Sequence, residues 1–346
     1  IDLVIPDIGY LLKNKEKIRG FVITHGHEDH IGGLPYVLQK IDAPIYGGKL
    51  AMGLVENKLK EHKLKNVDLN SVKARDKIKL GCFTVEFIKI SHSIPDSFAL
   101  AISTPVGVLI HTGGFKIDYT PIDGVVTDLH RFAELGQKGV LALMADSTNV
   151  ERPGYTMSER TVGETFRNIF GNAPGRIVVA TFASNVHRVQ QIIDAAEHYN
   201  RKIVVSGRSM INVMNVSIDL GYLRIKEDTI IDVNDMNKYP GEEIVIITTG
   251  SQGEPMSALT RMAYSEHRKI QLNQDDLVII PATAIPGNEK TVFKVIDKLM
   301  EIGTKVVYET LADVHVSGHA CQEELKLIHT LVKPKFFIPV HGEHRH

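Results

Sequence analysis

Residues 24–30 of the chain read Thr24-His25-Gly26-His27-Glu28-Asp29-His30. The apolar run Phe21-Val22-Ile23 before them predicts a buried strand, and residues 34–38 after them carry apolar side chains at helical spacing. The three histidines and the carboxylate therefore lie on a loop between two regular elements, a common place for chemistry. Imidazole and carboxylate groups suit Zn²⁺ and similar divalent ions. Four such groups within six positions can serve two ions, with His25 and His27 facing one and Asp29 and His30 the other. The alternative is a polar loop with scattered histidines.

The composition limits the class of protein. The 346 residues allow two domains with sizeable cores, and contents of 43% hydrophobic and 23% charged residues are typical of soluble globular proteins. No apolar run is long enough to cross a membrane, and residues 1–7 do not resemble a signal peptide. Two cysteines, Cys82 and Cys321, provide no disulfide framework and fit a reducing cytoplasm. With a net charge of −1, any contact with nucleic acid has to come from a local groove.

The pattern of apolar residues changes near residue 149. Before it, strands are predicted at 22–24, 82–90, 99–103, 108–111 and 140–145, with few helices between them. After it, strands and helices alternate, which predicts a mostly parallel sheet covered by helices. The predicted strands are 177–181, 203–205, 244–248, 277–280 and 305–308, and the predicted helices are 186–198, 210–220 and 291–302. Thr156-Met157-Ser158-Glu159 predicts a capping box that opens a helix before them.

Three loops of this second region follow predicted strands, where parallel sheets bind ligands. They span residues 181–185, 206–209 and 249–253, and they consist largely of small hydroxyl residues and glycines with one arginine, Arg208. Such groups suit phosphate oxygens. The alternative for each loop alone is a Ser/Gly-rich turn with no ligand.

The end of the chain returns to histidine. His315-Val316-Ser317-Gly318-His319 precedes a predicted helix, and the apolar strand 336–340 leads into His341. Asp146 ends the buried strand 140–145. Its carboxylate either caps the following turn or orients a ligand histidine or the attacking water, and we favour the second role.

Several motifs resemble a known family. His25-Gly26-His27-Glu28-Asp29-His30 resembles the HxHxDH signature of the metallo-β-lactamase fold, and Ser91-His92-Ser93-Ile94-Pro95 resembles its next metal-histidine motif. Asp146-Ser147-Thr148-Asn149, Ser317-Gly318-His319 and Pro339-Val340-His341-Gly342-Glu343 resemble motifs of the β-CASP nuclease branch. Together these motifs cover essentially the whole chain and are most similar to the bacterial ribonuclease J family.

The resemblance implies an α/β fold. It consists of a metallo-β-lactamase αββα sandwich, incomplete at its N-terminus, with an inserted Rossmann-like β-CASP domain of parallel sheet and helices. The implied domains are residues 1–148 and 309–346 for the sandwich and residues 149–308 for the insertion. The C-terminal domain of full-length relatives is not expected in this chain.

The resemblance also implies the roles of the site residues. His25, His27 and His92 would hold one metal ion, and Asp29, His30 and His341 would hold the other. The implied ion is Zn²⁺, two per chain in the family, with Mn²⁺ or Mg²⁺ as alternatives. Asp29 and Asp146 would serve catalysis, and His319 would give a proton to the leaving 3′-oxygen or stabilise the scissile phosphate. The residues expected to bind RNA are Ser184, Asn185, Arg208, Ser209, His315, Val316, Ser317, Gly318 and His319.

One motif departs from the family. Where the family reads HTGDFK, with an aspartate that bridges both metals, this chain has Gly114 in His111-Thr112-Gly113-Gly114-Phe115-Lys116. The expected function is therefore a metal-dependent ribonuclease, with 5′-to-3′ exonuclease and endonuclease activity in RNA decay and maturation, weakened at Gly114 and with partial or single metal occupancy. One alternative is a catalytically impaired RNA-binding or scaffold subunit. Another is a small-molecule metallohydrolase, against which the inserted domain argues.

The resemblance further implies the partners. The substrate would be single-stranded RNA, preferably with a 5′-monophosphate. The full-length form would be a homodimer or homotetramer, part of an RNA-degradation complex in the cytoplasm, with no membrane contact.

Overall fold

The computed structural model describes residues 4–285, 287–308 and 314–346. They form two compact units. The first, here called the histidine unit, comprises Ile1–Ser158 and Ser317–His346, and the second, the parallel-sheet unit, comprises Glu159–Val316. Both mix helices and strands, which confirms the predicted α/β class. The domain boundaries given above stay a prediction, because compactness alone does not define them.

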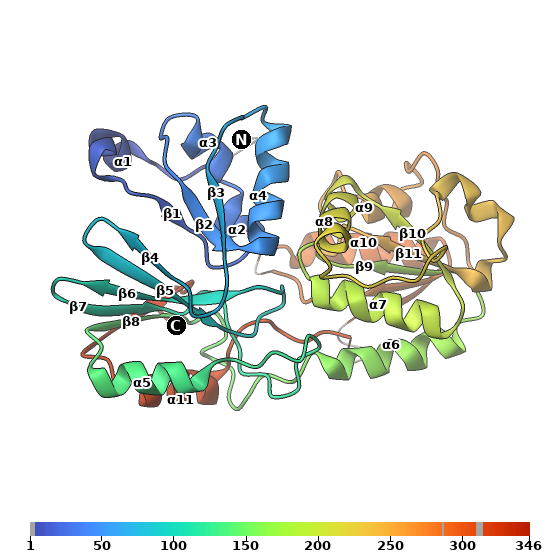
Figure 1. The fold of residues 1–346 in the computed structure, drawn as a ribbon. Helices are drawn as coiled ribbons and strands as arrows, with labels where there is room; N and C mark the ends of the chain where they lie inside the picture. Colours follow the sequence, from blue (N-terminus) through green and yellow to red (C-terminus); the bar gives the residue numbers. More distant parts are fainter. Residues whose placement is uncertain (1–3, 286, 309–313) are drawn as a thin grey trace. The chain divides into compact units, whose positions relative to one another are not determined.

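The histidine unit contains two sheets (Figure 1). The smaller is parallel and consists of β1 (Phe21–Val22), β2 (Ile45–Gly48) and β3 (Leu69–Val72). The larger has the order β14-β8-β7-β6-β5-β4. Its strands are β4 (Lys77–Leu80), β5 (Phe83–Lys89), β6 (Phe98–Thr104), β7 (Gly107–His111), β8 (Ala142–Asp146) and β14 (Phe336–Val340). In β14, Val340 pairs with Asp146 of β8, so the strand places the following His341 beside that carboxylate.

The helices of this unit cover both sheets. They are α1 (Gly9–Lys13), the 3-10 turn η1 (Lys15–Lys17), α2 (Glu28–Ile31), α3 (Leu34–Leu38), α4 (Lys49–Glu61), α5 (Leu129–Lys138) and α11 (Gln322–Val332). Figure 1 shows α5 and α11 side by side against the larger sheet.

The two-residue period of β5 explains this layering. Val85 and Phe87 point into a core shared with β3 of the smaller sheet, whereas Ile88 joins the core under α5 and α11. The centre of β5 is therefore buried on both faces, and the unit stacks as helix, sheet, sheet and helix.

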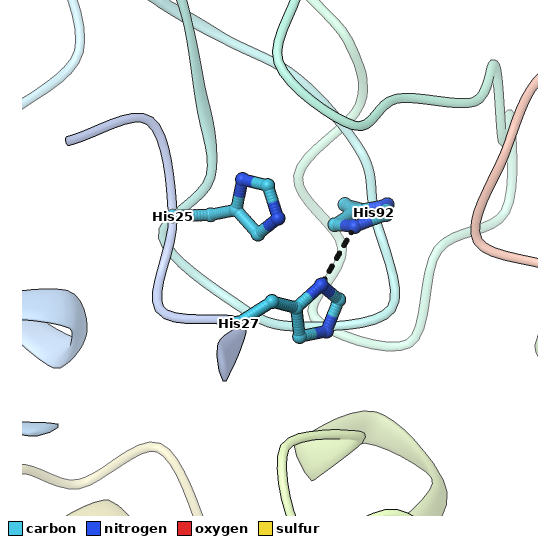
Figure 2. A group of neighbouring side chains, drawn as sticks. All are labelled: His25, His27 and His92. Atoms are coloured by element: carbon cyan, nitrogen blue, oxygen red, sulfur yellow. Dashed lines mark hydrogen bonds between the residues drawn. The ribbon is translucent and has the colours of Figure 1, made fainter. Parts of the chain in front are cut away.

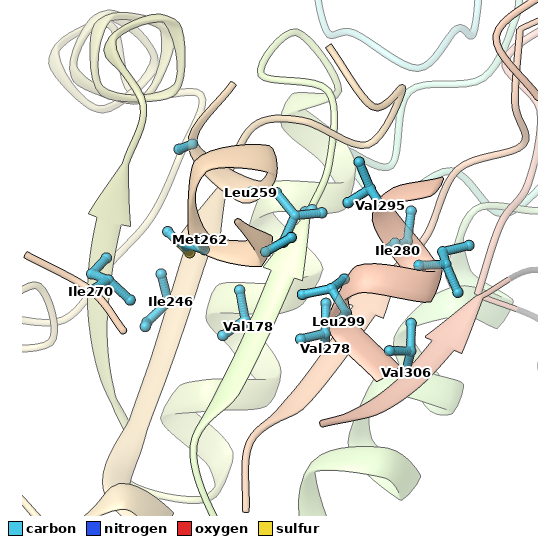
Figure 3. Packing of buried hydrophobic residues seen from close by; sticks show 14 of the residues in the cluster. Val178, Ile246, Leu259, Met262, Ile270, Val278, Ile280, Val295, Leu299 and Val306 are labelled. Atoms are coloured by element: carbon cyan, nitrogen blue, oxygen red, sulfur yellow. The ribbon is translucent and has the colours of Figure 1, made fainter. Parts of the chain in front are cut away.

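The parallel-sheet unit has one five-stranded sheet of order β10-β11-β9-β12-β13, in which every pair is parallel. The strands are β9 (Ile177–Ala180), β10 (Lys202–Ser206), β11 (Ile244–Thr248), β12 (Leu277–Ile280) and β13 (Lys305–Tyr308). The helices are α6 (Arg160–Asn172), α7 (Val186–His198), α8 (Arg208–Asp219), α9 (Ala258–Ala263) and α10 (Glu289–Glu301), with 3-10 turns η2 (Val233–Lys238) and η3 (Gly241–Glu243). Figure 3 shows Val178 and Val278 of the sheet packed against Leu259 of α9 and Leu299 of α10. Burial on both faces explains why β9 and β12 are apolar throughout.

The predicted capping box at Thr156 is wrong. Helix α6 begins at Arg160, and its N-cap residue, Glu159, makes no side-chain capping hydrogen bond. Glu159 instead binds the buried guanidinium of Arg188 at 2.6 Å, and the Thr156 hydroxyl lies 2.7 Å from the carboxylate of Glu324. The side chains of Thr156 and Glu159 therefore bind partners that are distant in sequence and do not form the predicted local capping box.

None of the helices in the described ranges is both long and apolar enough to cross a bilayer.

Candidate metal centre

Three histidines converge in the histidine unit. His25 and His27 lie on the loop between β1 and α2, and His92 follows β5. Figure 2 shows their rings pointing toward one another, and one nitrogen from each lies within 4.8 Å of the others. The rings of His25 and His92 are almost completely buried. His27 is half-buried, and three imidazoles at this spacing are able to hold a divalent ion.

The hydrogen bonds of His92 define which of its nitrogens can bind a metal. Its Nδ1 lies 2.8 Å from the carbonyl oxygen of Gly318, which can only accept, so Nδ1 carries the proton. Nε2 of the neutral ring is then free of a proton, and it accepts from Nδ1 of His27 at 3.0 Å. Ser93 Oγ lies 3.2 Å from the other nitrogen of His27. A carbonyl that fixes the tautomer in this way is typical of metal-binding histidines.

The charge state of this group also fits a cation. Burial, reinforced by the neighbouring imidazoles, lowers the pKa of His25 and of His92 well below the ordinary value for histidine. Burial likewise lowers the pKa of His27 to about 3, although the charge of Asp29 opposes it. All three rings are therefore neutral near pH 7, and neutral imidazole is the form that binds a metal.

A second group lies beside the first. Asp29, His30 and His341 each offer one ligand atom, and these atoms are also within 4.8 Å of one another. Nε2 of His30 is 3.3 Å from Oδ2 of Asp29, and Nε2 of His341 is 3.9 Å from the same oxygen. The hydrogen bond from His30 lowers the pKa of Asp29, so the carboxylate is charged. The rings of His25 and His30 are 4.1 Å apart at their centroids, which makes the two groups neighbours.

Asp146 and His319 form a polar pair next to both groups. Nδ1 of His319 donates to Oδ2 of Asp146 at 2.6 Å, and the Thr148 hydroxyl donates to Oδ1 at 2.7 Å. Burial disfavours the charged form of His319, but the hydrogen bond and charge of Asp146 outweigh burial and raise the pKa of the ring. Burial also disfavours the Asp146 carboxylate, and its hydrogen bonds with His319 and Thr148 outweigh burial and lower the pKa of Asp146. Asp146 therefore keeps His319 both oriented and ready to carry a proton.

Gly114 lies against the first histidine group. A Cβ atom added at this glycine would stand 2.7 Å from Nε2 and 2.8 Å from Cε1 of His92. The His92 ring thus occupies the space that any larger side chain at position 114 would enter. The described residues that form the two ligand groups supply one carboxylate, that of Asp29.

The residues predicted to contact RNA fall in both units. In the histidine unit, Ser317 Oγ accepts from Asn149 Nδ2 and from the amide of His319, and the carbonyl of Gly318 accepts from Nδ1 of His92.

In the parallel-sheet unit, residues 184–185 follow β9 and residues 208–209 follow β10, at the carboxyl ends of both strands. Ser184 precedes the α7 N-cap residue Asn185, whose side chain accepts from the amide of Arg188; Arg208 and Ser209 begin α8. Arg188 also contacts Nδ1 of His315 at 3.2 Å and donates to the carbonyl of Val316. Their binding of RNA stays a prediction.

The sequence motifs assign no site role to His111 or Glu324. In the structure, Nδ1 of His111 accepts from the amide of Gly113 at 3.0 Å. Burial first, then the charges of His30 and His341, lower the pKa of His111. The position of His111, three residues before Gly114, was the one available hint. Glu324 carried no comparable signal, because its partners are distant in sequence.

Three family models match the chain. Residues 3–113 match the metallo-beta-lactamase superfamily, residues 174–299 match the beta-CASP domain of ribonuclease J, and residues 304–346 match the Zn-dependent metallo-hydrolase RNA specificity domain.

Curated relatives named ribonuclease J align with the whole chain. The protein of Helicobacter pylori strain 26695 is 50% identical over 348 residues, which cover 100% of this chain and 50% of the relative. The proteins of Synechocystis and Thermus thermophilus are 49% and 46% identical over 100% of this chain, and the alignments cover 54% and 62% of those relatives. The chain thus spans about half the length of the first of these relatives.

A crystal structure of a protein of unknown function from Enterococcus faecalis V583 has a similar fold. It aligns with a TM-score of 0.67 at 18% identity, covering 94% of this chain and 76% of that one.

Proposed function

Because this chain belongs to the ribonuclease J family, we propose that it holds the hydrolytic centre of a metal-dependent ribonuclease. The observation that carries the proposal is the neighbourhood of two three-ligand groups and the Asp146–His319 pair. Two cation sites beside a positioned proton donor suit the hydrolysis of a phosphodiester. The match of residues 304–346 to an RNA specificity domain supports RNA as the substrate.

The donor atoms fit the implied ions. His25, His27 and His92 would hold one ion, and Asp29, His30 and His341 would hold the other. We propose Zn²⁺, since it favours imidazole ligands, with Mn²⁺ or Mg²⁺ as alternatives. Bound ions supply Lewis-acid stabilisation of the phosphate oxygens and lower the pKa of a coordinated water.

The other residues act on protons and on the substrate. His319, whose pKa is raised by its hydrogen bond with Asp146, gives its proton to the leaving 3′-oxygen. Asp146, held by Thr148, keeps the imidazole in the orientation for that transfer. The turn formed by Ser317 and Gly318 lies directly before His319 and offers backbone groups to the phosphate.

We extend the proposal to the mode of cleavage, the cellular process and the assembly. Single-stranded RNA is cut both from its 5′ end and internally, in RNA decay and maturation in the cytoplasm. The whole protein assembles as a homodimer or homotetramer within an RNA-degradation complex. A 5′-monophosphate is preferred, because the Ser- and Gly-rich loops suit a compact phosphate better than a bulkier triphosphate. Equal degradation rates for RNAs with the two 5′ ends would contradict this preference.

A second candidate is an RNA-binding subunit with impaired catalysis. The observation that favours it is Gly114, because a glycine has no carboxylate to bind a metal ion. The His92 ring fills the space that a side chain at this position would enter. In that case the chain would bind RNA with ordinary affinity and cut it very slowly.

Parallel assays separate these functions. The purified chain is incubated with single-stranded RNA, with a lactone and with a thioester, each with and without a chelator. We expect cleavage of RNA that the chelator stops. Efficient hydrolysis of the lactone or thioester with intact RNA would overturn the proposal, and tight RNA binding without cleavage would favour the second candidate.

A further inference from the structure

Glu324 joins three distant segments of the histidine unit. It lies in the first turn of α11, and its side chain is completely buried. Its Oε1 accepts from the amide of Ile117 at 2.7 Å, and its Oε2 accepts from the amides of Thr156 and Cys321, both at 2.7 Å. A buried carboxylate is tolerated when donors surround it in this way. Ile117 follows Gly114 by three residues, Thr156 lies near the end of the first part of the unit, and Cys321 follows His319 by two residues.

Thr156 extends this arrangement to His319. The Thr156 hydroxyl lies 2.7 Å from Oε2 of Glu324 and 2.8 Å from the carbonyl oxygen of His319, and its single proton can serve one of them at a time. Asn149 donates to the same carbonyl at 3.2 Å and to Ser317 Oγ at 2.8 Å. Ser317 Oγ in turn accepts from the amide of His319 at 3.1 Å. Both backbone polar groups of His319 are therefore held by side chains.

We infer that Glu324 and Thr156 are positioning residues for His319. Glu324 holds the amide of Cys321, and Thr156 holds the carbonyl of His319, so the two fix the backbone of residues 319–321. With the backbone fixed, the imidazole reaches Asp146 at 2.6 Å. The inference rests on the proposed function, in which His319 supplies a proton. A proton donor loses efficiency when its support loosens by a fraction of an ångström.

Thr156→Val tests the inference, because it removes the hydroxyl and keeps the shape of the side chain. Thr156→Ser keeps the hydroxyl. Thr104→Val is the matched control, since the Thr104 hydroxyl makes a comparable bond to the carbonyl of Gly107 at the β6–β7 turn. We expect Thr156→Val to lower kcat for RNA cleavage roughly ten- to a hundredfold. KM, metal content and the melting profile should stay close to those of Thr104→Val, and Thr156→Ser should restore most of the rate.

A double-mutant cycle shows whether Thr156 acts through His319. In a His319→Ala background, adding Thr156→Val should change kcat no further. An equal loss in both backgrounds, or a folded Thr156→Val protein with an unchanged kcat, would overturn the inference.

A measurement that needs no catalysis completes the test. The NMR signal of the proton between His319 and Asp146 should shift or broaden in Thr156→Val and persist in Thr156→Ser. An unchanged signal in Thr156→Val would also overturn the inference. A wild-type chain that does not cut RNA would contradict the proposed function instead, and the NMR result would still decide the role of Thr156.

Discussion

Nδ1 of His319 lies 2.6 Å from Oδ2 of Asp146, a carboxylate at the end of β8 that is almost completely buried. The two residues of the pair are 173 positions apart in the sequence, and the residues of the parallel-sheet unit lie between them in the chain. It gives the centre one imidazole that holds a proton more readily than its neighbours, because Asp146 raises the pKa of His319 while burial lowers the pKa values of His25 and His92. In the proposed function, this difference assigns proton transfer to His319 and metal binding to His25 and His92.

We predict that His319→Ala lowers turnover far more than RNA affinity. Removal of a positioned proton donor typically costs about 10²- to 10⁴-fold in rate. Single-turnover cleavage of end-labelled RNA gives the rate, and a binding titration gives the affinity. His130→Ala, at an exposed position in α5, is the control. A loss confined to affinity would assign His319 to substrate binding.

We predict that kcat falls on the alkaline side as His319 loses its proton. Since Asp146 raises the pKa of His319, the rate is retained above the ordinary pKa of histidine and declines as the pH rises through the raised value. Asp146→Asn removes the negative charge and should move this decline to lower pH. A pH–rate profile of both proteins checks the shift, and superimposable alkaline limbs would contradict the role of the pair.

We predict that the metal-free protein loses stability as the pH falls below the ordinary pKa of histidine. His25, His27 and His92 have lowered pKa values in the fold, so the unfolded chain takes up protons that the folded chain does not. Each such proton costs up to about 1.4 kcal/mol of unfolding free energy per pH unit. Urea unfolding with a chelator, at about pH 7.5 and about pH 5.5, measures the effect. It should be smaller in His92→Asn and unchanged in His130→Ala, and equal losses in all three proteins would contradict the explanation.

We predict that Gly114→Asp raises both metal stoichiometry and RNA cleavage. An aspartate would add a carboxylate beside the ligand groups, and its negative charge would offset the repulsion between two bound cations. It also displaces the His92 ring, because its Cβ would stand 2.7 Å from Nε2. Gly114→Ala is the matched control, since it displaces the ring without adding a carboxylate. If Gly114→Asp binds no more metal and cuts no faster than wild type, position 114 does not act as a bridging position.

Local patterns predicted the elements of the parallel-sheet unit closely, but they could not predict the supports of the site. The apolar run 244–248 and the helix 186–198 appear in the structure with the predicted bounds, because two-sided burial and helical periodicity leave a clear pattern. Thr156 shows the limit. Its local motif favours a helix cap, but its hydroxyl lies within hydrogen-bonding distance of Glu324 and of the His319 carbonyl, 168 and 163 positions along the chain.

The ligand histidines could be proposed from their motifs. The tautomer of His92 could not, because it depends on the carbonyl of Gly318, 226 positions away.

We propose that the two ligand groups make the chain a metal-dependent ribonuclease. Titration of Zn²⁺ into metal-free protein, with bound metal and cleavage of 5′-labelled, 5′-monophosphorylated RNA measured in the same samples, tests this proposal. We predict that cleavage is absent without metal, rises as the first ion binds, reaches its maximum at one or two ions per chain and disappears when a chelator is added. Undiminished cleavage by metal-free protein, or full metal binding with intact RNA, would contradict the claim.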